Sequence, residues 1–431
     1  MAREMKDSGI EWIGEIPCDW SIAPLKRIAS IQTGSTPSKT DEAILYSNEI
    51  GLPWIKAENL GSNYPIIKTK EYLTDDGSKI GRTFAQNTVY VCCIASVGKV
   101  GYSTIPASCN QQINALSFKN FDWKYGYYMT CSQETEYLLN ASGNVMKILN
   151  SEKQSMIMCP IPPLPEQHRI ADFLDCKCAE IDHVLEKTRA SIEEYKKLKQ
   201  SIITQAVTKG VRGEREMKDS GIEWIGEIPA EWKISRIKYV SSFEPPCDTS
   251  RLSPDSVITY TPMEYIKNGY YVPNTATLSS LSTSLTSYQS GDIVMAKVTP
   301  CFENGNISIM NNLSSAFGLG SSELFVFRAK SIHTQFLFYW LRNNRFVQTA
   351  CSTMTGTGGL KRVSSLFVKD SSLAVPPESE QIEIANYLDK KCSEIDTLIS
   401  KKEQFITELE SYKKSLIYEY VTGKKEAMND L

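Results

Sequence analysis

Apolar residues recur at every seventh position in the stretch from Pro162 to Gly210. This row consists of Leu174, Ile181, Thr188, Tyr195 and Ile202. A companion row lies four residues before members of the first row and contains Ile170, Val184 and Leu198. Two rows at this spacing predict a long helix at 166–209 with a seam for a partner helix. Such a helix would be on the order of 65 Å long, because each residue adds about 1.5 Å.

A second stretch repeats this pattern further along the chain, at an offset of 388 − 174 = 214 residues. Its rows consist of Leu388, Ile395, Lys402, Leu409 and Leu416, with Ile384, Leu398 and Tyr412 on the companion row. We therefore predict a second long helix at 380–422. Because each helix is polar over most of its circumference, it would be marginal alone. We expect the two helices to pair as an antiparallel coiled coil.

A leader of fifteen residues occurs twice without a change. The letters REMKDSGIEWIGEIP run from Arg3 to Pro17 and again from Arg215 to Pro229. A repeat period near two hundred residues indicates duplicated domains, since solenoid units are only about 20–50 residues long. Each copy consists of a leader, a mixed region and a long helix. The predicted divisions are leaders at 1–19 and 213–232, mixed domains at 20–160 and 233–375, and helical segments at 161–212 and 376–425.

The mixed regions contain short β-branched and aromatic runs that Gly, Pro and Asn interrupt, as in NTVYVCCIASVGKVGYSTI and VITYTPMEYI. These runs predict short strands. Both regions then become helical, at DWKYGYYMTCSQETEYLLN and at IHTQFLFYWLRNNRFVQTAC. The expected fold class is α+β. We predict two mixed domains of short strands with flanking helices, separated by the two long helices in a pseudo-two-fold internal repeat.

Length and charge narrow the range of functions. A chain of 431 residues is too long for one ordinary core, and its 41% hydrophobic and 23% charged content is typical of a folded soluble protein. No signal peptide and no window of about 20 apolar residues is present in the sequence, so we expect a cytoplasmic protein. The net charge of −3 argues against gripping nucleic acid by bulk electrostatics alone. Any DNA binding would be local or shared with a partner.

The sequence contains no familiar catalytic motif. A Gly-rich phosphate loop, a GxSxG turn, an HExxH helix and the Asn/Asp-Pro-Pro-aromatic loop of amino-methyltransferases are all missing from it. Twelve cysteines lie at irregular spacings, which favours free thiols in a reducing compartment. Cys176 and Cys178 form a close pair, but three histidines and no second Cys-x-Cys pair do not favour a zinc site. We predict a chain that is not an enzyme by itself, with no catalytic residue, metal or cofactor.

Several loops of the mixed domains combine basic, amide and hydroxyl side chains. Such side chains suit phosphate contact and base-edge reading, because Arg and Lys pair with guanine while Asn and Gln bridge adenine. The DNA-binding candidates in the first domain are Lys56, Asn59, Ser96, Lys99, Asn110, Gln111 and Gln112. Those in the second domain are Lys297, Thr299, Asn304, Asn306, Ser321, Ser322, Lys361 and Arg362. The alternative for these residues is an ordinary network of turn hydrogen bonds.

The leader SGIEWIGEIP, the helix start IPPLPEQHRIADFLD with its counterpart VPPESEQIEIANYLD, and the stretch GDIVMAKVTPCFENGN together resemble the specificity subunit of type I restriction-modification systems. The resemblance covers essentially the whole chain. It implies two target recognition domains, each reading one half of a bipartite, asymmetric site in double-stranded DNA. It also implies that the long helices set the spacer and dock two methyltransferase subunits, which hold S-adenosylmethionine and modify adenine. Motor-nuclease subunits would add ATP- and Mg-dependent translocation and cleavage.

Other interpretations stay open from the sequence. The chain could be a coiled-coil scaffold that joins protein partners without touching DNA, or the recognition subunit of a methylation-only system. The identical leaders are explained either by recombination that exchanges one mixed domain for another or by a shared docking turn under constraint.

Overall fold

The computed structural model describes residues 3–37, 45–61, 64–247, 253–282, 284–356 and 359–427. Contacts within the chain divide it into two units. The first unit comprises Met1–Thr188 and Gln404–Leu431, and the second comprises Arg189–Glu403. Each unit therefore contains one leader, one mixed domain and a segment of both long helices. No helix in the described part of the chain is both long and apolar enough to span a membrane.

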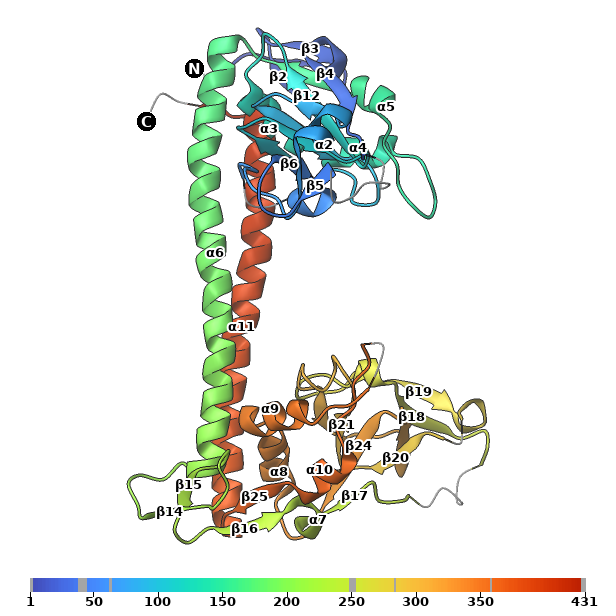
Figure 1. Ribbon diagram of the computed structural model, residues 1–431, viewed down its shortest axis with the longest axis vertical. Helices are drawn as coiled ribbons and strands as arrows, with labels where there is room; N and C mark the ends of the chain where they lie inside the picture. Colours follow the sequence, from blue (N-terminus) through green and yellow to red (C-terminus); the bar gives the residue numbers. More distant parts are fainter. Residues whose placement is uncertain are drawn as a thin grey trace. The chain divides into compact units, whose positions relative to one another are not determined.

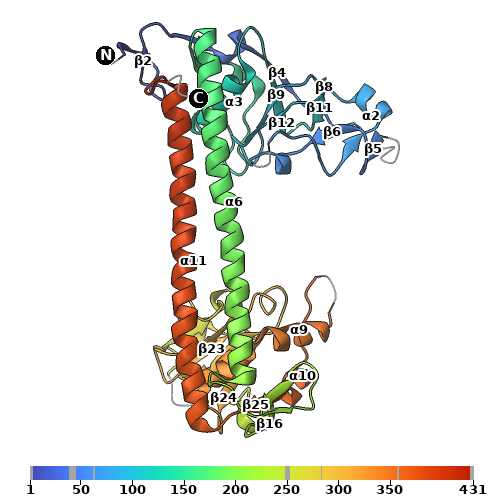
Figure 2. The same cartoon turned by 90° about the vertical axis from the view of Figure 1, so that its left-hand side faces the viewer.

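The two long helices are α6 (Leu164–Lys209) and α11 (Glu378–Val421) (Figure 1 and Figure 2). A Pro-Pro pair precedes each helix and keeps the chain extended there, because proline disfavours a helical residue before it. Each helix is followed by a glycine in the left-handed region, Gly210 at φ 78° and Gly423 at φ 72°. Glycine adopts this conformation without steric cost, so it ends a helix readily.

Within each unit, α6 and α11 pair antiparallel. In the first unit, Phe173 stacks on Tyr420 at 4.4 Å between ring centroids, and Asp182 lies 2.6 Å from the ammonium of Lys413. In the second unit, the Lys199 ammonium lies 2.6 Å from Asp396. The residue numbers on α11 fall as those on α6 rise, so the two helices run in opposite directions. These contacts and the two mixed domains described below confirm the predicted α+β fold class with its paired long helices.

One of the predicted seam rows is wrong beyond its first members, Ile170 and Ile384, which are buried. Val184 is 41% exposed, and the other exposed members of that row are Leu198, Leu398 and Tyr412. The companion row instead lies three residues before the correctly predicted one, where Cys178, Leu185 and Ile192 are buried in α6. Leu185 is only 4% exposed. The remaining predicted seam residues are buried or half-buried, at Leu174, Ile181, Tyr195, Ile202, Leu388, Ile395, Leu409 and Leu416.

The strands of the first unit form a hairpin, two sheets and a strand pair. They are β1 (Met5–Asp7), β2 (Glu15–Pro17), β3 (Ser21–Pro24), β4 (Ala29–Thr33), β5 (Tyr46–Ser47), β6 (Leu52–Ile55), β7 (Tyr72–Leu73), β8 (Thr83–Phe84), β9 (Thr88–Cys92), β10 (Val100–Ser103), β11 (Ala107–Cys109), β12 (Ile113–Phe118) and β13 (Met158–Ile161). The short helices are α2 (Asp75–Ile80), α3 (Trp123–Ser132), α4 (Glu134–Asn140) and α5 (Ser151–Ser155). The strand orders are β10-β9-β12-β4 in one sheet and β5-β7-β6-β11-β8 in the other, with β3 paired to β13 and β1 to β2.

The second unit repeats this arrangement. Its strands are β14 (Met217–Asp219), β15 (Glu227–Pro229), β16 (Lys233–Arg236), β17 (Ser241–Phe243), β18 (Val257–Thr261), β19 (Thr275–Thr277), β20 (Thr286–Gln289), β21 (Ile293–Ala296), β22 (Ile307–Ile309), β23 (Phe317–Gly320), β24 (Leu324–Ala329) and β25 (Ser372–Val375). The short helices are α7 (Ile237–Val240), α8 (Thr334–Leu341), α9 (Asn344–Ser352) and α10 (Ser365–Asp370). The strand orders are β17-β24-β21-β22 and β19-β18-β23-β20, with β16 paired to β25 and β14 to β15.

One short helix joins each mixed domain to the long helices. In the first unit this is α3, whose Tyr128 hydroxyl donates to Asp175 of α6 at 2.7 Å. In the second unit it is α8, whose Tyr339 hydroxyl donates to Asp389 of α11 at 2.7 Å. The runs YGYYM and FLFYWL supply the buried aromatic residues of these two helices. The long helix, the short helix and one sheet therefore share a single core in each unit.

The corrected seam leads to a test with adjacent residues of α6. Leu185→Ala should lower the free energy of unfolding by about 2–5 kcal/mol, because it removes buried methyl groups and leaves a cavity. Val184→Ala should change that free energy by no more than about 0.5 kcal/mol, because the side chain faces solvent. Urea unfolding of the full chain, followed by circular dichroism, compares the two. Equal losses from both variants would contradict the assignment.

Candidate nucleic-acid interface

In its described residues each mixed domain contains one pair of parallel strands, and polar residues follow β6 and β11 in the first unit and β23 in the second. In the first unit β6 and β11 run parallel, with Cys109 opposite Ile55. Lys56 and Asn110 follow directly, and the Asn110 amide N–H donates to the Ile55 carbonyl at 3.1 Å. In the second unit β18 and β23 run parallel, and Ser321 directly follows β23. The carboxyl ends of parallel strands meet at one sheet edge, so each unit collects polar side chains there.

The candidates at this edge of the first unit are engaged in local contacts. The Lys56 ammonium lies 2.7 Å from Glu71 and 4.6 Å from the centroid of the Trp54 ring. Asn59 accepts a hydrogen bond from the Lys56 amide at 2.8 Å. These two side chains therefore brace the turn that follows β6. The contacts of Lys56 and Asn59 are those of a turn hydrogen-bond network, which was the alternative to DNA binding.

The Asn-Gln-Gln turn after β11 is also hydrogen-bonded within itself. The Asn110 side-chain amide donates to the Gln112 side chain at 3.1 Å, and the Gln112 backbone N–H donates to Asn110 Oδ1 at 3.1 Å. Gln111 accepts from the Thr36 hydroxyl, and its side chain is exposed. Asn110 and Gln112 thus shape the turn, while Gln111 points outward from it.

A second turn of the first unit lies beside this one. It connects β9 to β10 and contains Ser96 and the exposed Lys99. The Cys93 backbone N–H, at the start of the turn, donates to the Gln112 carbonyl at 2.7 Å. The structure thereby brings the two predicted loops of the first domain together, although they are separated in the sequence.

The candidates of the second unit also converge. The Thr299 hydroxyl donates to the Gly359 carbonyl at 2.9 Å and accepts from the Lys361 backbone N–H at 3.0 Å. Arg362 forms two hydrogen bonds with Glu323, at 2.7 and 2.9 Å. This bond to the guanidinium holds the pKa of the Glu323 carboxyl below its usual value. Two loops far apart in the sequence therefore meet at one place.

The other predicted residues of the second unit surround this contact. The Lys297 ammonium lies 5.4 Å from the centroid of the Phe325 ring. Ser321 accepts from the Glu323 backbone N–H at 3.2 Å, and Ser322 is exposed. Asn304 is exposed and Asn306 is half-buried, both in the turn from β21 to β22. The exposed side chains Ser322, Asn304 and Lys361 are the ones that a ligand can reach without rearrangement.

The prediction omitted the loop of the first unit that corresponds to Lys361 and Arg362. At an offset of 362 − 148 = 214 residues, these positions match Lys147 and Ile148. The Ala95 backbone N–H donates to the Lys147 carbonyl at 3.1 Å, so this loop lies beside the turn from β9 to β10. The helix offset, applied to the candidates, would have found the loop. Lys147 and Ile148 are both exposed, but only Lys147 is basic, whereas both residues at these positions in the second unit are basic.

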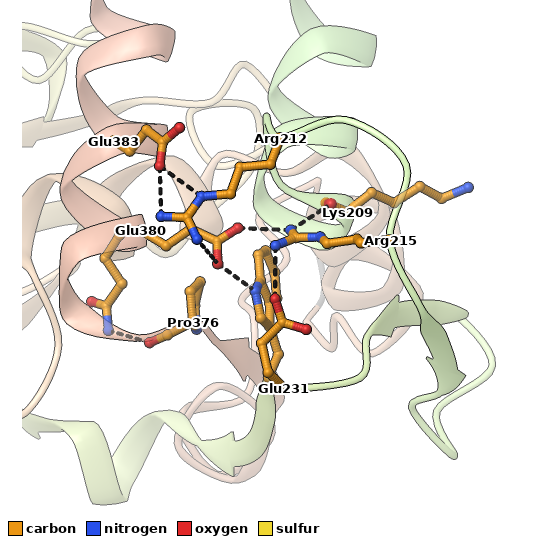
Figure 3. A network of polar contacts seen from close by, with 9 residues as sticks. Lys209, Arg212, Arg215, Glu231, Pro376, Glu380 and Glu383 are labelled. Carbon is orange, nitrogen blue, oxygen red and sulfur yellow. Dashed lines mark hydrogen bonds and ion pairs between the residues drawn. The ribbon is translucent and has the colours of Figure 1, made fainter.

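A buried carboxylate fixes the start of each long helix to the leader. In the first unit Glu166 accepts from the Trp20 indole at 2.9 Å and pairs with Arg3 at 2.5 Å. In the second unit Glu380 accepts from the Trp232 indole at 3.0 Å and lies 2.7 Å from Arg215 (Figure 3). Each carboxylate is shielded from water and faces one neutral indole donor and a guanidinium of the leader, and Glu380 has a second guanidinium, that of Arg212, at 3.8 Å.

The glutamine after each buried carboxylate fixes the mixed domain to the same helix start. Gln167 accepts from the Asp122 backbone N–H at 2.9 Å, and Gln381 accepts from the His333 backbone N–H at 2.7 Å. Asp122 and His333 stand immediately before α3 and α8. The Glu-Gln pair therefore joins three elements: the leader, the mixed domain and the long helix.

Neither a metal site nor a disulfide is found in the described residues. No group of three potential ligands comes together there, and all twelve cysteines are free. Cys178 is buried in the core of the first unit, while Cys176 lies 3.7 Å from Glu180. Burial raises the pKa of the Cys178 thiol to about 11, so it remains protonated at neutral pH.

Comparisons with known proteins agree on one family. A family model described as the type I restriction modification DNA specificity domain matches residues 17–194 and again residues 229–408. The EcoAI type I restriction enzyme specificity subunit of Escherichia coli is 29% identical over 191 residues, which cover 43% of this chain and 32% of that protein. The MjaVIII specificity subunit of Methanocaldococcus jannaschii is 24% identical over 446 residues, covering 96% of this chain and 95% of that protein.

The EcoAI and EcoEI relatives are matched over only about a third of their own length. A solved structure described in work on complex assembly and conformational transition of the type I R-M system has the same fold. It aligns with a TM-score of 0.70 and 14% identity over 96% of this chain and 99% of that chain.

The buried carboxylate can be tested against an exposed neighbour. Glu380→Ala should reduce the free energy of unfolding by about 3–5 kcal/mol, because it leaves Arg215 and the Trp232 indole without their buried partner. Glu383→Ala should cost less than about 1 kcal/mol, because its pair with Arg212 is exposed to solvent. Tryptophan fluorescence during urea unfolding reports the difference. A Glu380→Ala variant as stable as Glu383→Ala would refute the proposed importance of this contact.

Proposed function

Because this chain belongs to the type I restriction modification DNA specificity family, we propose that it is the DNA recognition subunit of a type I restriction-modification complex. Each unit reads one half of a bipartite, asymmetric DNA site. One observation carries this proposal: the same two-sheet scaffold occurs twice, while the side chains at its polar edge differ. A scaffold-only role, considered from the coiled-coil pattern, receives no support from the relatives.

The side chains at corresponding turns support different half-sites. The turn after β11 presents Gln111, whereas the turn after β23 presents Ser322. The neighbouring loops present Lys147 in the first unit and Lys361 with Arg362 in the second. An amide recognises the adenine edge, a hydroxyl reads either kind of base pair, and cations pair with guanine or phosphate. Two different sets of donors on one scaffold favour a non-palindromic target.

We propose that catalysis belongs to partner subunits. The residues gathered at each polar edge are amides, hydroxyls and cations, which bind and orient DNA but form no nucleophile–base pair in the described chain. Methyltransferase subunits would hold S-adenosylmethionine, and motor-nuclease subunits would use ATP and Mg. A near-neutral reader needs partners that supply most of the phosphate contacts. We expect the complex to act in the cytoplasm, where chromosomal and incoming DNA are accessible.

The duplicated leaders support two copies of the same partner. Each leader forms the same hairpin, with Met5 opposite Pro17 and Met217 opposite Pro229. In both copies the same acidic positions are exposed, at Glu4, Asp7, Glu11 and Glu15 and at Glu216, Asp219, Glu223 and Glu227. Identical sequence, fold and exposure produce two equivalent surfaces. Two methyltransferase subunits with basic docking faces would fit them.

The long helices are proposed to set the gap between half-sites. Both helices are continuous across the division between the units. One added heptad would lengthen a helix by about 10 Å, or roughly three base pairs at 3.4 Å each. The gap should therefore depend on helix length and should be insensitive to changes in the recognition loops.

Single substitutions should change one half-site at a time. Gln111→Ala should relax preference in the half-site of the first unit, with a loss of about 1–3 kcal/mol at one base pair, and leave the other half unchanged. Ser322→Ala should relax preference in the half-site of the second unit and leave the half-site of the first unit unchanged. Selection from randomised DNA by the complex assembled with methyltransferase subunits measures both halves and the gap.

Glu186→Ala, exposed on α6, is the control for this selection and should change neither half nor the gap. A selected site that loosens in both halves with either single variant, or in neither half with both variants, would contradict separate reading by the units.

Charge reversal in the leaders should remove partners one at a time. The pair Glu11→Lys and Glu15→Lys should weaken binding of one methyltransferase subunit at least tenfold, because like charges then face each other. The same changes at Glu223 and Glu227 should weaken binding of the second methyltransferase subunit. Native mass spectrometry counts the bound subunits. Asp76→Lys, an exposed change on α2, should retain both, and full assembly with all four leader changes would rule out this docking surface.

A further inference from the structure

Arg342 is a buried cation without an ionic partner. It follows α8 directly and is only 7% exposed. In the described part of the chain its side chain has a single hydrogen bond, from Nη2 to Asn268 Oδ1 at 2.6 Å, and Nε has no partner there. Among the described residues, no carboxylate forms an ion pair with its guanidinium within 4.0 Å. A guanidinium has five N–H donors, and leaving them unmatched in a buried place is unfavourable.

The guanidinium lines a groove of about 570 Å³ in the second unit. Loop residues Asn268–Tyr270 form one wall, the end of α8 forms another, and α11 from Asp389 to Lys401 forms the third. The guanidinium carbon lies 4.9 Å from the centroid of the Phe338 ring, which holds the side chain in place. Gly269, at φ 101°, leaves space next to the guanidinium.

The two aspartates in this groove accept hydrogen bonds from other side chains, Asp389 through Oδ1 alone and from neutral donors. Asp389 accepts from Gln335 and Tyr339, both at 2.7 Å. Both Asp396 oxygens lie within hydrogen-bond distance of the Lys199 ammonium, at 2.6 and 2.7 Å. Lys401 adds an exposed cation at the far end. Burial lowers the pKa of Arg342 from its ordinary value, and nearby groups that include Asp396 and Asp389 oppose this shift.

The first unit does not have this arrangement. Tyr128 and Tyr339 correspond at an offset of 211 residues, and the same offset matches Arg342 with Cys131. Near Cys131, the Tyr64 ring packs 5.8 Å from Tyr127 and its hydroxyl bonds the Val100 carbonyl. The buried arginine is therefore not a requirement of the shared fold.

We propose that the Arg342 groove binds one phosphodiester of the DNA backbone beside the half-site of the second unit. This inference rests on the proposed DNA recognition and adds a positioning contact that the first unit lacks. A guanidinium matches two phosphate oxygens with parallel N–H donors. Such a contact fixes the register of the protein on the duplex and carries no base preference.

The salt dependence of DNA binding tests the contact. In the complex with methyltransferase subunits, Arg342→Gln should reduce the slope of log affinity against log salt by about 0.9, the value for one phosphate. The loss should be similar for target and unrelated DNA. Arg342→Lys keeps the charge and should retain the slope, while Cys131→Ala is the matched control in the first unit. An unchanged slope in Arg342→Gln would overturn the proposal.

Neutral methylphosphonate linkages provide a second test that does not require Arg342→Gln to fold. One linkage near the half-site of the second unit should weaken wild-type binding. The same linkage should have a smaller effect in Arg342→Lys, because lysine keeps the charge but cannot contact two phosphate oxygens with parallel donors. Equal effects of every linkage in both proteins would overturn the proposal. Loss of a methyltransferase subunit from Arg342→Gln with an unchanged slope would instead assign the groove to an acidic protein segment.

The two levels of proposal are distinguishable in the same experiment. Wild-type complex that shows no preference for any DNA sequence would refute the proposed recognition function. Wild-type complex that selects a site, combined with no effect of Arg342 on slope or linkage, would refute only the phosphate contact.

Discussion

The buried carboxylate at the start of each long helix connects all the parts of a unit. Glu166 and Glu380 each bind an indole from the segment that leads into the mixed domain and a guanidinium from the leader. A carboxylate in such a place is expensive unless it is fully compensated, so leader, domain and helix must arrive together. The following Gln167 and Gln381 extend the constraint to α3 and α8. The positions of the recognition loops on each helix pair therefore depend on this contact.

Some features built on the buried carboxylate are the same in the two units, and others differ between them. The leader hairpins, the anchors and the ion pairs Asp182–Lys413 and Lys199–Asp396 are equivalent in the two units. The turns after the parallel strands and the position of Arg342 are not. Shared surfaces suit two copies of one partner, whereas different loops suit two different half-sites. The near-neutral charge of the chain agrees with a reader that relies on partners for much of its grip on DNA.

The candidate contacts show the limit of reading loops from composition. The polar loops do meet at one edge in each unit, but Lys56, Asn59 and Arg362 are paired with neighbours of their own chain. Residue type cannot distinguish a side chain that braces a turn from one that faces a ligand, because the difference depends on partners elsewhere in the chain. Arg342 was missed for the same reason: in the sequence it lies within an aromatic helical run typical of a core.

The sequence by itself determined the duplication, the two long helices, their antiparallel pairing and the α+β class. Periodicity and exact repetition are local or additive properties, so they survive in the one-dimensional pattern. Only the tertiary structure decided that Leu185 and Ile192, rather than Val184 and Leu198, face the partner helix. Both rows satisfy a seven-residue repeat, and the choice depends on the side chains that the partner presents. Only the tertiary structure likewise placed a buried arginine without a carboxylate beside an open groove, because pairing and burial are relations between distant residues.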